Sequence, residues 1–160
     1  LLVLQNILNY DYLWIRLRVK GGAYGCMSGF GRDGDCYMVS YLDPKLAETN
    51  EVYEQLPEYL EQFNQDERSM DRYVIGAISE MDIPKNPAAL GVRGLTAYLS
   101  GITREQLQKE RDEVIDTDAK EIRALAPYAK AVLSNNCLCV VGNENKIKEN
   151  SALFTTVRSL

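Results

Sequence analysis

Apolar residues recur every three or four positions along the first segment of the chain. One stripe consists of Val3, Ile7, Tyr10, Trp14 and Leu17, at steps of 4, 3, 4 and 3 residues. This spacing is that of one face of a helix, and it predicts a helix over residues 3–19. Lys20-Gly21-Gly22 follows, and a basic last turn before glycine is typical of a helix end.

The next segment alternates apolar and small residues, which predicts a β-hairpin over residues 23–32 and 35–42, turning at Asp33-Gly34. With a two-residue turn, one face would carry Tyr24, Cys26, Ser28, Phe30, Tyr37, Val39 and Tyr41. The other face of the first strand would carry Gly25, Gly29 and Gly31. These glycines permit either the close approach of a ligand or the packing of a tightly twisted strand, and the pattern favours neither.

Residues 45–135 show helical spacing with clear start signals. Asn86-Pro87 places an N-cap before a proline, and Thr103-Arg104-Glu105-Gln106 is a capping box. Two further helices are expected, one around residues 70–81 and one over about residues 118–134.

Cys137-Leu138-Cys139-Val140-Val141 is an apolar run that predicts a buried strand, with both cysteines as reduced thiols in the core. The order of helix, hairpin, several helices and strand predicts an α+β fold, with helices packed on an antiparallel or mixed sheet. Three strands would leave exposed edges and too little area for these helices. We therefore expect one domain over residues 1–160 that lacks at least one strand before Leu1.

The composition is that of a globular domain, with 46% apolar and 26% charged residues among 160. The net charge is −5, and residues 45–82 hold ten acidic side chains against three basic ones. This balance argues against a nucleic-acid partner, and no apolar stretch approaches the ~20 residues that cross a bilayer. The acidic segment includes a helical row of Glu48, Glu51, Glu54, Glu58 and Glu61. Such a row is typical of a solvated helix face, with the capture of cationic peptides as the alternative.

The chain contains no histidine and does not begin with methionine. Without histidine, this chain alone cannot form a Ser-His-Asp triad or a histidine-based zinc site, and a thiol enzyme using Cys26 would lack a histidine base. Residues 29–34 match the dinucleotide pattern GxGxxG, but a strand follows instead of the required helix. A start at Leu1 inside an apolar run predicts a piece of a longer polypeptide.

The segment from Arg18 to Tyr24 is the most distinctive candidate for chemistry. Arginine in the last turn of a helix and tyrosine at the start of a strand are joined by Gly21-Gly22. Such a joint can bring a guanidinium and a phenol together, and these donors suit a peptide carbonyl or an oxyanion. The alternative is that Arg18 complements the helix dipole and that Tyr24 is an ordinary strand residue. From physical arguments alone this alternative is favoured.

Leu17-Arg18-Val19-Lys20-Gly21-Gly22-Ala23-Tyr24-Gly25 resembles the C-terminal Arg/Tyr motif of insulinase (pitrilysin) family zinc peptidases. The presequence-protease and falcilysin-like branch is the most similar, because its arginine and tyrosine are also six positions apart. The resemblance continues through the hairpin and the helical segment to residues 136–143, and so covers nearly the whole chain.

The resemblance implies a role in proteolysis. Members of this family consist of four homologous α/β domains, which form two halves around a chamber for unfolded peptides. The N-terminal half binds zinc through an inverted HxxEH motif, and the C-terminal half supplies the arginine and tyrosine. By this resemblance, Arg18 and Tyr24 position the peptide and stabilise the tetrahedral intermediate, and Gly21 and Gly22 belong to the substrate-binding joint.

The sequence departs from the family by lacking HxxEH and zinc ligands. The resemblance therefore implies an N-terminally truncated C-terminal domain that is inactive alone, with zinc bound elsewhere in the parent metallopeptidase. The expected partners are the N-terminal domains of the same polypeptide and a peptide substrate. The expected location is the cytoplasm, or an organelle matrix if the source is eukaryotic. An acidic peptide-binding or adaptor module without enzymatic role is the alternative.

Overall fold

The first helix runs from Leu2 to Lys20, as predicted, but most of it is wound more widely than an α-helix. In the computed structural model, which describes residues 1–159, α1 spans Leu2–Ile7. Two π-helical segments, η1 (Leu8–Tyr12) and η2 (Trp14–Lys20), continue it. Because π-helical turns are rare and frequently occur at functional sites, the C-terminal half of this helix becomes a candidate region.

The predicted hairpin is present, but its loop is one residue longer than expected. β1 (Gly25–Phe30) and β2 (Cys36–Tyr41) form a two-stranded antiparallel sheet. The N–H of Gly31 donates to the carbonyl oxygen of Asp35 at 2.7 Å, and Gly34 has φ of +95°. A three-residue loop that ends in such a glycine is a common hairpin connection.

The longer loop shifts the pairing register by one residue, which corrects the predicted faces of the second strand. Tyr37 pairs with Gly29 and not with Phe30, so Tyr37, Val39 and Tyr41 lie on the glycine face. A one-residue shift moves every side chain of a strand to the other face. This face is not bare at Gly29, where a Cβ atom would lie 2.5 Å from the Tyr37 ring.

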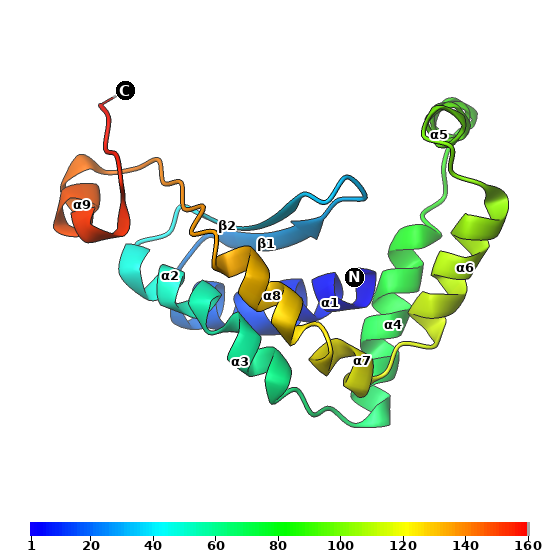
Figure 1. Cartoon of the computed structure of the whole chain (residues 1–160), viewed down its shortest axis with the longest axis horizontal. Coiled ribbons are helices and arrows are strands. Elements are labelled where there is room, and N and C mark those ends of the chain that lie inside the picture. The colour runs from blue at the N-terminus through cyan, green and yellow to red at the C-terminus, as the bar shows by residue number, and fades with distance from the viewer. Residues whose placement is uncertain (160) are drawn as a thin grey trace.

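The hairpin lies over the first helix (Figure 1), and their interface is part of the hydrophobic core. The N–H of Ser28 donates to Oδ1 of Asn9 at 2.6 Å, which links β1 to the helix. The buried hydrophobic residues are Val3, Leu4, Ile7, Leu8, Tyr12, Leu13, Leu17, Ala23, Leu56, Leu60, Phe63, Met70, Tyr73, Ala77, Val114, Ile122 and Ala126. The first helix supplies seven of them, so it is the centre of the core.

Two of the remaining helices begin at the predicted start signals. Asn86 and Thr103 cap two of them, and Gln106 completes the predicted capping box. These helices are α2 (Leu46–Glu54), α3 (Leu56–Glu61), α4 (Glu67–Met81), α5 (Pro87–Leu99), α6 (Arg104–Ile115), α7 (Ala119–Arg123), α8 (Ala126–Leu133), α9 (Glu144–Glu149) and the 3₁₀ turn η3 (Ser151–Leu153). With the two-stranded sheet, they confirm the predicted α+β class. Within residues 1–159, no helix has the length and apolar character needed to cross a membrane.

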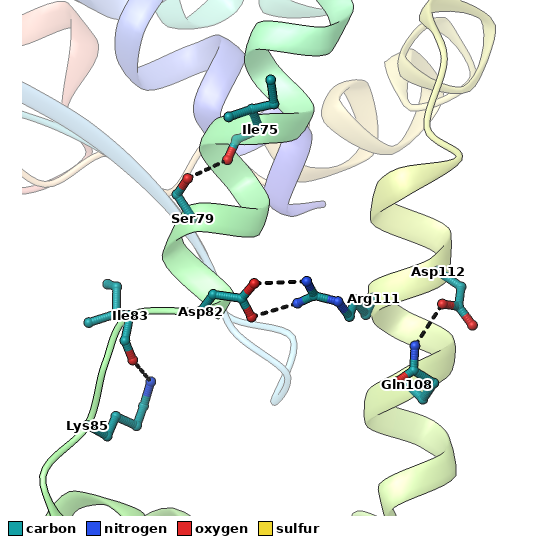
Figure 2. Close-up of polar contacts among 8 residues, drawn as sticks. All are labelled: Ile75, Ser79, Asp82, Ile83, Lys85, Gln108, Arg111 and Asp112. Atoms are coloured by element: carbon teal, nitrogen blue, oxygen red, sulfur yellow. Dashed lines mark hydrogen bonds and ion pairs between the residues drawn. The ribbon is translucent and has the colours of Figure 1, made fainter.

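A bidentate ion pair joins α4 to α6 at one end of the molecule. Arg111 donates from both terminal nitrogens to the carboxylate of Asp82, at 2.6 and 2.8 Å (Figure 2). The guanidinium holds the pKa of Asp82 below its ordinary value. Since the pair is exposed to solvent, it orients the two helices more than it stabilises the fold.

Helix α5 extends beyond α4 and α6 at this end of the molecule (Figure 1) and has no buried residue. Its large exposed apolar side chains are Leu90, Val92, Leu95, Tyr98 and Leu99. Helix α5 therefore adds nothing to the core described above.

The predicted strand over residues 137–141 is wrong. The described sheet consists of β1 and β2 alone. Asn136 has φ of +47°, and the N–H of Leu138 donates to the carbonyl oxygen of Asn136. Cys137 and Cys139 are exposed, which also corrects their predicted place in the core. An apolar run becomes a strand only where a neighbouring backbone satisfies its N–H and C=O groups, and residues 1–159 provide none here.

The four free cysteines divide into two classes of thiol. Burial raises the pKa of both Cys26 and Cys36, whereas Cys137 and Cys139 are exposed. Only the thiolate reacts with an alkylating reagent, and raising a thiol's pKa lowers its thiolate fraction at a given pH. At pH 7.5 we expect Cys137 and Cys139 to be alkylated first, as followed by peptide mass spectrometry.

Alkylation in urea is the control, because all four thiols should then react at similar rates. Preferential labelling of Cys26 in the folded chain would contradict this expectation and would revive the thiol-enzyme hypothesis.

Candidate functional site

The turn after the first helix depends on two glycines. Gly22 has φ of +89°, and its N–H donates to the carbonyl oxygen of Arg18 at 3.1 Å. Ala23 is buried, and its N–H donates to the carbonyl oxygen of Leu17 at 2.9 Å. A Cβ atom on Gly21 would lie 2.4 Å from that same oxygen. Both glycines therefore permit a tight reversal that anchors the start of the hairpin against the helix end.

This reversal places Arg18 beside Tyr24. The central guanidinium carbon of Arg18 lies 5.9 Å from the centroid of the Tyr24 ring, and both side chains are exposed. The two residues singled out in the sequence are thus neighbours in space. Gly21 and Gly22 form the joint between them, as expected from their positions.

Two aromatic residues that sequence reasoning did not assign to the site complete the cluster. The guanidinium carbon of Arg18 lies 4.1 Å from the centroid of the Trp14 ring. The ring centroids of Tyr24 and Tyr41 lie 6.1 Å apart in an edge-to-face arrangement. Trp14 was interpreted only as part of the apolar stripe, although its spacing of four residues from Arg18 places both on one helix face. The predicted register placed Tyr41 on the same strand face as Tyr24, but no sequence signal assigned Tyr41 to the site. We call Trp14, Arg18, Tyr24 and Tyr41 the aromatic–arginine cluster.

The side-chain N–H groups of Arg18 have no protein acceptor in the described part of the chain, residues 1–159. A guanidinium carries five donors, so Arg18 can bind carbonyl or oxyanion oxygens. The phenol of Tyr24 can donate one more hydrogen bond. The cluster therefore offers a positive charge and several donors beside exposed aromatic rings.

Arg16 differs from Arg18 because its guanidinium is already engaged. It stacks on the Tyr12 ring, 4.6 Å from the centroid, and donates to Oε1 of Gln55 at 3.0 Å. Arg16 lines an open groove of about 500 Å³ together with Gln55, Glu58, Tyr59, Gln62, Phe63, Asn64 and Gln65. This groove lies on α3 and does not include the aromatic–arginine cluster.

The predicted row of five glutamates is exposed and extends over both α2 and α3. These helices are separated at Gln55, two residues before Pro57. The row is a solvated face, and only Glu58 reaches the groove described above.

The described residues do not bring metal donors together. Within residues 1–159, no three side chains of His, Cys, Asp or Glu are placed together to hold a metal ion. The donor set of the described residues therefore does not fit a zinc site.

Comparison with known proteins shows the family of this chain. Residues 1–143 match the family described as the PreP C-terminal domain, and the chain belongs to this family. It is 47% identical over 158 residues to protein HypA of Clostridium perfringens (strain 13 / Type A), covering 99% of the chain and 16% of that relative.

Two presequence proteases are also similar. Presequence protease 1, chloroplastic/mitochondrial, of Arabidopsis thaliana is 29% identical, covering 99% of the chain and 15% of that relative. The mitochondrial presequence protease of Emericella nidulans is 28% identical, covering 92% of the chain and 14% of that relative. The chain thus spans about one sixth of the length of these curated relatives. It is the C-terminal domain of a presequence-protease-like peptidase, as the Arg/Tyr motif predicted.

Proposed function

We propose that this domain is the substrate-positioning part of a zinc-dependent endopeptidase, in which Arg18 and Tyr24 contact the peptide close to the cleaved bond. The observation that carries this proposal is the placement of the Arg18 guanidinium 5.9 Å from the Tyr24 ring. Both groups are exposed, and the Gly21-Gly22 joint holds them together. Membership of the PreP C-terminal domain family supports a parent peptidase. We propose that this peptidase degrades unfolded peptides in a closed chamber.

The proposed chemistry is hydrogen bonding to a carbonyl oxygen that gains negative charge. When water adds to the carbonyl carbon of a peptide bond, that oxygen becomes an oxyanion. The N–H groups of Arg18 and the O–H group of Tyr24 would donate to it, or to the neighbouring main-chain carbonyls. Donors that are already placed before the reaction stabilise the tetrahedral intermediate more than the ground state.

The remaining parts of the enzyme belong to the longer polypeptide. The proposed partners of this domain are N-terminal domains of the same polypeptide and the peptide substrate. We propose that zinc is bound in those domains by the HxxEH motif that the resemblance implies. We propose a cytoplasmic location. An organelle matrix is the alternative, since two of the relatives are named as organellar proteases.

Tyr24→Phe in the full-length polypeptide tests the role of the phenol. The ring and its packing are retained, and only the O–H donor is lost. We expect kcat/KM for an unstructured peptide to fall about 10- to 100-fold, somewhat less than for the loss of a dedicated oxyanion donor. Zinc content, measured by elemental analysis, should stay the same.

Tyr128→Phe is the matched control, because Tyr128 is an exposed tyrosine on α8 outside the cluster. It should leave peptide turnover unchanged. Full activity of the Tyr24→Phe enzyme would remove Tyr24 from the proposed machinery.

A further inference from the structure

We propose that Trp14 is a positioning residue, which holds the guanidinium of Arg18 by its face so that the N–H edges stay available to a main-chain carbonyl of an extended peptide. This inference rests on the proposed function of Arg18. It adds Trp14 to the proposed pair of Arg18 and Tyr24, and it gives a physical cause for the orientation of the Arg18 guanidinium.

The geometry of the three side chains supports this role. The guanidinium carbon of Arg18 lies 4.1 Å from the Trp14 ring centroid and 5.9 Å from that of Tyr24. Both distances are within the ~6 Å over which a cation is attracted to an aromatic face, and tryptophan gives the strongest attraction. Arg18 is thus held by two rings, one from its own helix and one from the start of the hairpin.

Attraction to a ring uses a different part of arginine from an ion pair. A ring interacts with the charge through the flat face of the guanidinium, whereas a carboxylate binds its N–H edges. Figure 2 shows the second case, in which two terminal nitrogens of Arg111 donate to Asp82. Arg32 is likewise paired with Glu110. The side-chain N–H groups of Arg18 have no such partner within residues 1–159, so they are free to donate to a substrate.

The exposure of the cluster fits a binding surface better than a core. Trp14 is 37% exposed and Tyr24 is 66% exposed, whereas Leu13 and Leu17 of the first helix are buried. The Tyr41 and Tyr24 rings pack edge to face with an interplanar angle of 76°, so Tyr24 also contacts an aromatic ring of the second strand. A free arginine side chain loses much rotamer freedom on binding, and stacking removes part of this cost in advance.

A double-mutant cycle in the full-length polypeptide tests the inference. Trp14→Leu should lower kcat/KM about 3- to 30-fold, the range expected for loss of a cation–π contact. Trp14→Phe should retain most of the activity, because a smaller ring still attracts the cation. In an Arg18→Ala background, Trp14→Leu should cause almost no further loss, since a positioning residue acts only through its partner.

Tyr10→Leu is the matched control. Tyr10 is an exposed aromatic residue one turn earlier on the same helix, and it does not stack on Arg18. This change should leave kcat/KM unchanged, and the urea midpoints of all variants should agree with that of the parent.

The outcomes separate this inference from the function on which it rests. An equal loss from Trp14→Leu with and without Arg18 would overturn the positioning role. Loss in Arg18→Ala with full activity in Trp14→Leu would overturn the inference and leave the proposed function intact. Full activity in Arg18→Ala would overturn both.

Discussion

Replacing Arg18 by alanine in the full-length polypeptide is expected to lower kcat/KM for peptide hydrolysis by about 10²- to 10³-fold, the usual loss for one oxyanion donor. The change removes both the positive charge and all the N–H donors beside the Trp14 and Tyr24 rings. The loss should fall mainly on kcat, because the donors interact most strongly when charge develops on the carbonyl oxygen. Steady-state kinetics with an unstructured peptide give this measurement.

Arg18→Lys separates charge from shape. Lysine keeps the charge but lacks the planar donor fork that can stack on a ring and bind two oxygens. We expect its activity to lie between those of the parent and Arg18→Ala. Zinc content should be equal in all three proteins. A fully active Arg18→Ala enzyme would refute the assigned role, and a loss of zinc would indicate that the domain contributes to metal binding instead.

Ile7→Ala is expected to lower the free energy of unfolding of the 160-residue chain by about 2–5 kcal/mol. Ile7 is 0% exposed, and it lies at the end of α1, which packs against both α4 and β1. Removing its side chain leaves a cavity between elements that cannot close up without moving backbone. Urea unfolding followed by circular dichroism gives the difference.

Ile75→Ala is the matched control for this substitution. Ile75 also lies in a helix, α4, but it is 64% exposed. Its replacement should change stability by no more than about 0.5 kcal/mol. Equal effects of the two changes would mean that α1 does not form the centre of the core.

Features that depend on a few adjacent residues were predictable from the sequence. The helix starts at Asn86 and Thr103 are confirmed, because a capping side chain bonds to a backbone N–H within three residues. The hairpin is also confirmed, because its two strands are joined by a loop of only a few residues. Its register was wrong, because the pairing depends on whether two or three residues form the loop at Asp33-Gly34.

Features that need a distant partner were not predictable. The apolar run over residues 137–141 was interpreted as a strand, yet nothing in the described chain pairs with it. The predicted burial of Cys137 and Cys139 depended on that strand and is wrong as well. Apolar character states what a segment can bury, but only the fold states whether another surface covers it.

The aromatic–arginine cluster combines a local feature that the sequence predicts with contacts that only the fold determines. Because the Gly21-Gly22 turn is short, the amino-acid order alone was enough to bring Arg18 close to Tyr24. The four-residue spacing places Trp14 and Arg18 on the same side of the helix, but it does not show whether their side chains are in contact. The tertiary structure decided that the Trp14 and Tyr24 rings face the guanidinium, because side-chain directions follow from how the hairpin packs on the helix.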